Sequence, residues 1–199
     1  MQWNTQQWYA GQDVYLIGGG KSLGAFDWKR LHNKLTVGCN DAYRLGPSVC
    51  NVCVFGDDKW YKKNEEGLKT FPNPIFTNHR IYQLHKKVLW LERVDHGLSR
   101  TQLGFGGSTG CIALNLALIL GARRVFLLGF DMKIDETGQA NWHQFNIGKP
   151  NKNSYERFSK GFARMAIDLP TVFSGREVIN LGPDSKLDVF PMNNMDKFI

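Results

Sequence analysis

The sequence reads Asp13-Val14-Tyr15-Leu16-Ile17-Gly18-Gly19-Gly20-Lys21-Ser22 near its start, a short apolar run that ends in three consecutive glycines. Such a run is typical of a buried strand followed by a tight turn. Comparable runs recur at residues 35–38, 49–55, 124–130 and 177–180. Because they are continuously apolar and do not alternate with polar residues, they predict central strands of a parallel sheet whose two faces are both covered.

Helical segments separate these strands. The strongest prediction is a helix over 109–120, because apolar residues recur on one face and Gly121 supplies a stop. Ser154 can cap another helix that runs to about Ala166. We also expect a polar helix at 59–68, a short helix at 26–31, and two weaker strands at 74–77 and 87–91. Strands that alternate with helices predict an α/β fold, a single Rossmann-like three-layer domain over residues 1–199 with a mainly parallel sheet.

The 199 residues have an ordinary globular composition, with 42% hydrophobic residues and a net charge of +7. The positive excess fits an anionic partner such as a nucleotide, a nucleic acid or a phosphosugar, and it fits a merely basic surface equally well. No apolar run reaches the ~18 residues of a membrane helix. The start Met1-Gln2-Trp3-Asn4 lacks the features of a signal peptide. The sequence therefore predicts a cytoplasmic protein with no membrane partner.

Two of the four cysteines have the spacing of a metal or redox motif, in Cys50-Asn51-Val52-Cys53. Because this stretch reads as a strand, we expect the two thiols to point to opposite faces, where they cannot share a metal ion. Buried, reduced cysteines are the better interpretation.

Ligands of open parallel sheets bind beyond the carboxyl ends of the strands. Polar or glycine-rich residues follow the predicted strands at 18–22, Asn40-Asp41, Gly56-Asp57-Asp58 and Asp131, and Gly106-Gly107-Ser108-Thr109-Gly110 opens the strongest helix. We expect these five segments to converge on one crevice, where free amides at helix starts suit a phosphate. The plain alternatives are a tight turn at the glycines and a simple N-cap at Ser108.

The glycine turn matches neither of two common phosphate-binding motifs. A Walker A loop requires a glycine five residues before Gly20, where Tyr15 stands. The third glycine of the dinucleotide fingerprint falls at Leu23, so an oxidoreductase that uses a dinucleotide is disfavoured. The sequence has no Asp-x-Asp triplet, so a metal-bridged sugar nucleotide is not indicated.

Residues 131–153 form a long polar segment, and we expect a lid over the crevice, because loops of this length in compact domains are usually functional. His143 lies within it and can act as a general base near neutral pH. The competing interpretation is a solvated histidine packed beside Trp142. Asp131 directly follows a buried strand, where a carboxylate indicates a binding or orienting role, and Asp57 has a similar position.

Several of these motifs, in this order, resemble a family of bacterial sialyltransferases. The resemblance rests on the Gly-x-Gly-x-Ser-Leu turn at 18–23, on Cys39-Asn40 after the second strand and on Ser108-Thr109-Gly110 before an Ala/Leu-rich helix. Leu128-Gly129-Phe130-Asp131 and a histidine in the following loop continue it. The same order of motifs is similar to the domain family of the archaeal 6-hydroxymethylpterin diphosphokinase. It is also similar to phage proteins, for which the ending at 179–191 is typical. The resemblance covers residues 13–191.

The resemblance implies a glycosyltransferase-like enzyme that uses a nucleotide-activated sugar as co-substrate, with no metal and no further cofactor. It implies His143 as the general base on an acceptor hydroxyl. Together with the predicted crevice, it gives the set of nucleotide-binding candidates Gly18, Gly19, Gly20, Lys21, Ser22, Asn40, Gly56, Asp57, Ser108, Thr109, Gly110, Asp131 and Met132.

The chain departs from the sialyltransferases at three places. Gly19 and Gly56 stand where those enzymes have asparagines, and Tyr155 is the only nearby candidate for their pair of tyrosines at the leaving phosphate. A nucleotide or phosphorylated donor is therefore a better expectation than CMP-sialic acid.

Two other functions stand beside this one. A diphosphokinase-like phosphotransferase requires Mg²⁺ held by Asp57 or Asp131. A non-catalytic module that binds a nucleotide or a nucleic acid keeps the crevice without the chemistry. A phage origin makes a modified DNA base a plausible acceptor, with which the charge of +7 is compatible.

Overall fold

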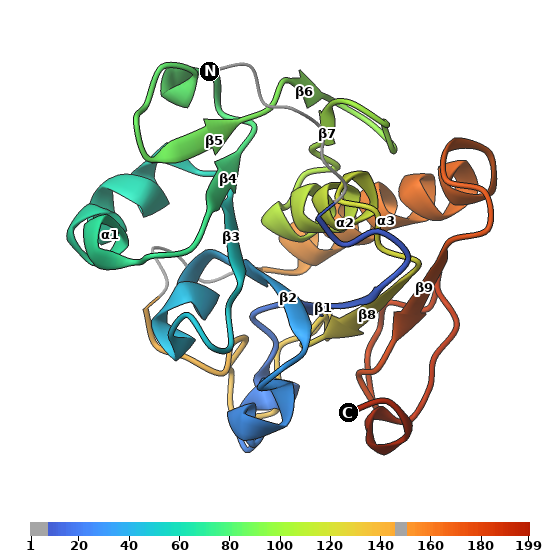
Figure 1. Cartoon of the computed structure of the whole chain (residues 1–199). Helices are drawn as coiled ribbons and strands as arrows, with labels where there is room; N and C mark the ends of the chain where they lie inside the picture. The colour runs from blue at the N-terminus through green and yellow to red at the C-terminus, as the bar shows by residue number, and fades with distance from the viewer. Residues whose placement is uncertain (1–7, 146–150) are drawn as a thin grey trace.

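A seven-stranded parallel sheet forms the centre of the protein (Figure 1). The computed structural model describes residues 8–145 and 151–199. From one edge of the sheet to the other, the strands are β5 (Val88–Trp90), β4 (Ile75–Thr77), β3 (Val52–Phe55), β2 (Leu35–Cys39), β1 (Asp13–Ile17), β8 (Arg124–Leu128) and β9 (Glu177–Asn180). Every pairing in this sheet is parallel. The predicted parallel sheet is confirmed. The runs at 13–17, 35–38, 49–55 and 124–130 give four adjacent strands inside it, whereas the run at 177–180 forms an edge strand, β9.

Helices cover both faces of the sheet (Figure 1). The α-helices are α1 (Asp58–Thr70), α2 (Thr109–Ile119) and α3 (Lys152–Val172). Shorter elements complete the chain: the 3₁₀ helices η1 (Lys21–Leu23), η2 (Trp28–Leu31), η3 (Asn40–Leu45), η4 (Arg80–Tyr82) and η5 (Met195–Lys197), and a two-stranded sheet of β6 (Arg93–Val94) and β7 (Leu103–Gly104). Helices α2 and α3 pack on one face, and α1 packs with η2 and η3 on the other. The expected Rossmann-like three-layer α/β architecture is confirmed.

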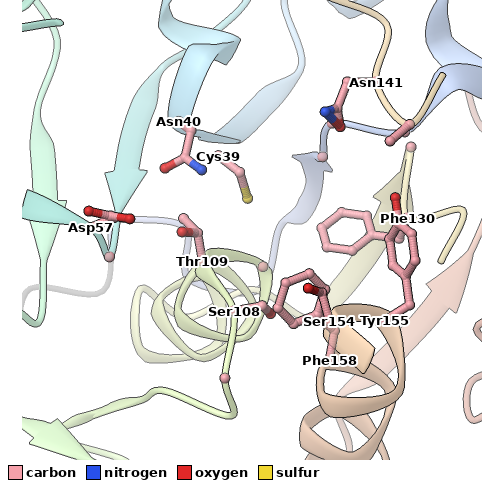
Figure 2. A pocket seen from close by; sticks show the side chains of 18 of the residues that line it. Cys39, Asn40, Asp57, Ser108, Thr109, Phe130, Asn141, Ser154, Tyr155 and Phe158 are labelled. Carbon is pink, nitrogen blue, oxygen red and sulfur yellow. The ribbon is translucent and has the colours of Figure 1, made fainter. Parts of the chain in front are cut away.

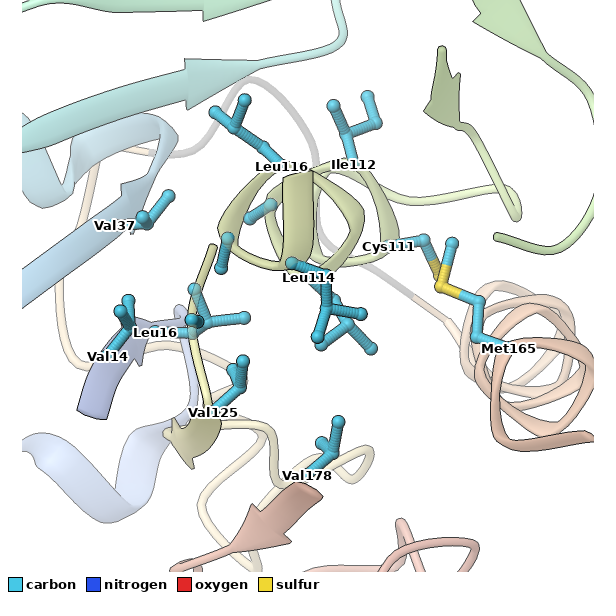
Figure 3. Close-up of a cluster of buried hydrophobic side chains, with 14 of the residues drawn as sticks. Val14, Leu16, Val37, Cys111, Ile112, Leu114, Leu116, Val125, Met165 and Val178 are labelled. Atoms are coloured by element: carbon cyan, nitrogen blue, oxygen red, sulfur yellow. The ribbon is translucent and has the colours of Figure 1, made fainter. Parts of the chain in front are cut away.

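Strand β1 shows why the apolar runs are continuous. Val14 and Leu16 belong to the cluster that packs around α2 (Figure 3), whereas Tyr15 and Ile17 belong to the cluster on the opposite face. Successive side chains of a strand point to opposite faces, so a strand covered on both sides needs apolar residues at every position. Burial of each such side chain stabilises the fold by roughly 1.5–3 kcal/mol.

Helix α2 is the buried helix of the fold, and every residue from Cys111 to Ile119 is inaccessible or nearly so. Asn115, a polar residue within it, is fully buried, and both the oxygen and the nitrogen of its amide group are hydrogen-bonded. The Asn115 amide oxygen accepts hydrogen bonds from the backbone amides of Ser99 and Gly104, and its amide nitrogen donates to the Ser99 carbonyl. This side chain thereby fastens the segment that carries β7 to α2.

Three expectations need correction. Asn151, not Ser154, is the N-cap of α3; Ser154 takes the third helical position and completes a capping box with Asn151. The short helix expected over 26–31 is a 3₁₀ helix, η2. Cys50 precedes β3, so it lies with Cys53 in the same hydrophobic cluster and not on the opposite face. All four cysteines are free, as expected.

The strand order reverses at β1, which pairs with β2 on one side and with β8 on the other. Ligands of such sheets bind in the crevice at this reversal, beyond the carboxyl ends of the strands. The segment expected to form a lid, 131–153, leaves the end of β8 and includes residues 146–150, which lie outside the described residues, as does the start of the chain at 1–7. Within the described residues, no helix is both long and apolar enough to span a membrane.

Candidate functional site

A cavity of about 870 Å³ lies at the carboxyl ends of the strands (Figure 2). Its walls come from residues that follow five neighbouring strands, from β8 through β1, β2 and β3 to β4. The first turns of α2 and α3 close one side of it, and Ala140, Asn141 and His143 contribute to the wall as well. The crevice expected from the strand ends is therefore a single large pocket.

The structure brings twelve of the fourteen predicted site residues to this cavity. They are Gly18, Gly19, Gly20, Asn40, Gly56, Asp57, Ser108, Thr109, Gly110, Asp131, Met132 and His143. Lys21 and Ser22 do not line it. The side chain of Lys21 donates to the Gln139 side chain, and Ser22 is bound to Asp131.

The sequence suggested that groups after the glycine turn bind a phosphate. In the structure, the Asp131 carboxylate accepts the hydrogen bonds of Ser22 instead. It accepts a hydrogen bond of 2.8 Å from the Ser22 amide and one of 2.6 Å from the Ser22 hydroxyl. Asp131 is 5% exposed, so these bonds are needed to hold a carboxylate out of water. The expectation that the residues after the glycines present free amides to a ligand is therefore wrong at Ser22.

Close packing accounts for two of the three glycines. A Cβ on Gly20 would lie 2.5 Å from the Asp131 carboxylate and 2.6 Å from the Gly129 carbonyl oxygen, and a Cβ on Gly18 would lie 2.5 Å from the same oxygen. No real side chain tolerates such contacts with backbone. Glycine is thus required here so that the end of β1 can approach the end of β8, independently of any ligand.

The start of α2 points into the cavity (Figure 2). Ser108 caps the helix by accepting from the Cys111 amide at 3.2 Å. Gly106 and Gly107 have positive φ values of 48° and 84°, and they turn the chain into the helix. A cap satisfies only part of the four free amides at a helix start, which carry partial positive charge. Gly56 packs closely against this start, because a Cβ there would lie 2.7 Å from Cδ1 of Ile112 and 3.5 Å from the Thr109 hydroxyl.

The charged residues of the cavity wall divide into partnered acids and unpaired bases. Each acid accepts bonds from the protein: Asp41 from Trp60 and Arg44, Asp57 from the Lys59 amide, Asp58 from Lys62 and Tyr82, and Asp131 from Ser22. Among residues 8–145 and 151–199, the side chains of Lys59, Lys133 and Arg157 form no ion pair. Asp57 and Asp131 accept only from neutral donors and keep their negative charge, so the described wall combines carboxylates that are held by the protein with three cations that can bind an anionic ligand.

Polar groups with unmet hydrogen-bonding capacity gather at the carboxyl ends of β2 and β4. Asn40 has a positive φ of 50°, which is uncommon outside glycine, and its amide oxygen is buried with no hydrogen-bond partner among the described residues. The Nδ1 atom of His79 is likewise buried with no hydrogen-bond partner among the described residues. Both residues line the cavity. Strained or unsatisfied groups of this kind cluster at functional sites.

His143 faces the cavity from the segment that follows β8. Its ring lies between the rings of Trp142 and Phe145, at centroid distances of 4.6 and 5.9 Å. Burial lowers the pKa of His143; Asp41 raises it and Arg44 lowers it. The imidazole is therefore neutral at neutral pH, as the general-base prediction requires.

Two other titratable side chains of the wall are unsuited to act as nucleophiles. Burial raises the pKa of the Cys39 thiol, so this residue is held in its protonated form and is not activated. Burial, and then Asp131, raises the pKa of Tyr155 to about 12. Tyr155 therefore offers a hydroxyl proton for hydrogen bonding throughout the physiological range.

Several wall residues were not among the sequence-based candidates. Among them are Lys59, Trp60, His79, Phe105, Lys133, Asn141, Arg157 and Phe158. Lys59 directly follows the candidate segment Gly56-Asp57-Asp58, so its position could have been inferred. Arg157 and Phe158 come from the first turns of α3, and nothing in their local sequence marks them.

Within the described residues, no group of three or more His, Cys, Asp or Glu side chains is arranged to hold a metal ion. Comparisons with protein-family models, with curated proteins and with solved structures find no match to this chain.

Proposed function

We propose that the protein is a glycosyltransferase-like transferase that binds a nucleotide-linked donor in this cavity and passes a group from it to an acceptor hydroxyl. The observation that carries the proposal is the combination of the α2 start with three unpaired cations around one pocket. A helix start and basic side chains both favour negative charge, and phosphate is the ligand that uses both.

The dimensions of the cavity suit a ligand larger than a phosphate ion. Strands in a sheet are ~4.8 Å apart, so a wall that runs from β8 to β4 extends over about 19 Å. A volume of about 870 Å³ lies in the upper part of the ~300–1,000 Å³ range of small-molecule sites. The site therefore has room for a nucleotide together with a transferred group.

The wall supplies distinct groups for the parts of such a donor. Arg157, whose side chain lies beside Gly107 just before α2, and Lys59 both line the cavity and would bind the phosphates, as charge develops on the leaving group. Phe105 and Phe158 offer apolar surface to a ring. His143 also lines the cavity, and its role as general base is a prediction from the family resemblance. A hydroxyl on modified phage DNA as acceptor likewise stays a prediction.

The second candidate, a Mg²⁺-dependent phosphotransferase, would draw on Asp57 and Asp131. Their carboxylates already accept bonds from the Lys59 amide and from Ser22. We rank this candidate below the first for that reason, and the same experiment tests it.

A thermal-shift screen over CMP, UDP, GDP, ADP and their sugar conjugates, with and without Mg²⁺, tests the proposal. A ligand that binds only the folded state raises the melting temperature by mass action. We expect at least one nucleotide to do so without Mg²⁺, whereas dependence on Mg²⁺ would favour the phosphotransferase.

Arg157→Gln should weaken that binding by about 10- to 150-fold, the loss expected for a charge-assisted hydrogen bond. Lys160→Gln is the matched control, because it removes the same charge from the same helix at a residue that does not line this cavity. Equal losses in the two variants, or no stabilisation by any nucleotide, would contradict the proposal.

A further inference from the structure

Trp142 lies in the described part of the segment after β8, and it is hydrogen-bonded to the glycine turn at residues 18–20. The backbone amide of Trp142 donates to the Gly19 carbonyl at 3.0 Å, and its indole N–H donates to the Gly18 carbonyl at 2.9 Å. The Trp142 ring packs against the Trp28 ring, with centroids 5.1 Å apart. His143 follows directly, so its backbone position is determined by these contacts.

Arg44 contacts Phe145, which follows His143 on the side away from Trp142. Its guanidinium donates to Asp41 at 3.0 Å and to the Asn64 side chain at 2.5 Å, which holds it in one orientation. In that orientation it lies over the Phe145 ring, 4.4 Å from the centroid. The Lys63 ammonium donates to the Phe145 carbonyl at 3.1 Å. Phe145 is thereby held by two cations from η3 and α1.

The position of Phe145 determines which nitrogen of His143 carries the proton. The Phe145 backbone amide donates a hydrogen bond to Nδ1 of His143 at 3.3 Å. A backbone amide is always the donor, so Nδ1 must present its lone pair. In a neutral imidazole the other nitrogen, Nε2, then carries the hydrogen.

We propose that Arg44 and Phe145 hold His143 as a neutral hydrogen-bond donor, which binds an oxygen of the ligand through Nε2–H and does not remove a proton from the acceptor. The identity of that oxygen rests on the function proposed above, since a phosphate or bridging oxygen of the donor gains negative charge during transfer. The tautomer itself depends only on the contacts of this loop.

The charges around the ring agree with a neutral donor. Asp41 and Arg44 from η3, and Lys63 from α1, face the loop that carries the ring. Among the described residues the Asp41 carboxylate accepts from Arg44 and from the Trp60 indole and forms no hydrogen bond with His143, so the ring lacks the orienting partner that a general base usually has. A neutral imidazole that donates from the cavity wall stabilises developing negative charge without transferring its proton.

Nitrogen NMR of the His143 ring at neutral pH tests the tautomer without any ligand. We expect a proton-free Nδ1 and a protonated Nε2, and the reverse assignment would overturn the inference. Arg44→Gln should shift the tautomer populations and raise the pKa of His143, because Arg44 lowers it. Arg164→Gln is the control, because this arginine pairs with Asp168 on α3 and should leave the ring signals unchanged.

Two substitutions of His143 then separate a donor from a base. Glutamine can donate from a position similar to Nε2 but cannot act as a base, whereas alanine can do neither. For the nucleotide with the largest thermal shift, we expect His143→Ala to weaken binding about 2- to 12-fold, the loss of one neutral hydrogen bond. His143→Gln should stay within about 3-fold of the natural protein.

A general base predicts instead that both variants bind normally and lose turnover alike, by about 10²–10⁴-fold, and that result would overturn the donor role. If no nucleotide binds, the proposed function fails, and the NMR assignment alone decides the state of His143.

Discussion

Ser22 and Asp131 join the end of β1 to the end of β8 by two hydrogen bonds. The Ser22 amide lies 2.8 Å and its hydroxyl 2.6 Å from oxygens of the Asp131 carboxylate. These residues are 109 positions apart in the chain, and they lie where the strand order of the sheet reverses. The pair therefore determines how closely the ends of β1 and β8 approach each other. The cavity is built on these two strand ends.

Asp131→Asn should lower the free energy of unfolding by about 1.5–3 kcal/mol, the range for hydrogen bonds to a charged group. The substitution keeps the shape of the side chain, but one of the two acceptor oxygens becomes a donor. Urea unfolding measures the change. Asp184→Asn makes the same chemical change at an exposed residue and should leave stability within about 0.5 kcal/mol of the natural protein. Similar values for both variants would show that the Ser22 contact does not contribute.

Gly20→Ala should destabilise the fold by about 1–3 kcal/mol, because its Cβ would overlap the Asp131 carboxylate and the Gly129 backbone. Gly19→Ala is the neighbouring comparison. Its Cβ would meet only the Asn141 side chain, at 2.9 Å, which can move, so we expect a smaller loss. Urea unfolding of the two variants without any ligand is the measurement. If neither loses stability, the glycines are required by the ligand and not by packing.

Asp58 should make the protein more sensitive to acid. Hydrogen bonds from Lys62 and then from Tyr82 hold the pKa of Asp58 below its ordinary value. A carboxyl group with a depressed pKa in the folded state stabilises the fold at pH values above its unfolded pKa of ~3.9, and this contribution disappears as the pH falls through the folded pKa. Tyr82→Phe removes one donor, so its unfolding free energy should fall less steeply below about pH 4.

The control for that experiment is Tyr15→Phe, which removes a hydroxyl that donates to the Phe198 carbonyl at 2.7 Å. Because its acceptor does not titrate, this variant should lose stability equally at every acidic pH. Denaturant unfolding between pH 7 and pH 3 compares the slopes. Parallel curves for the natural protein and Tyr82→Phe would show that the Tyr82–Asp58 bond has no part in the acid response.

The strands could be predicted from sequence because both faces of the sheet are covered. Burial on both sides leaves only apolar residues in β1 and β8 after their first residues, Asp13 and Arg124, and this is visible without any knowledge of their partners. The bounds of α3 were harder to predict, since Asn151 and Ser154 are both good capping residues and the structure uses both in one capping box. The helix also continues past the expected end to include Pro170 in its last turn.

The candidate site was predictable where residues follow strands directly, as at Asn40 and Asp57. It was not predictable where a residue reaches the cavity from a helix, as Arg157 does, because this depends on the direction and rotation of α3 over the sheet. Ser22 shows the opposite failure. Its motif suggested a ligand, but a carboxylate more than a hundred residues away takes both of its donors.

The position of β1 between β2 and β8 has a consequence for how the protein is made. Asp13 pairs with Arg124, so 111 residues separate the two strands in the order of synthesis. At ~5–20 residues per second, a ribosome adds them in about 6–22 s. During that interval β1 can pair on one side only, and its other edge offers unpaired backbone groups to any strand it meets. Emerging chains of this protein should therefore bind chaperones until β8 has left the ribosome and paired with β1.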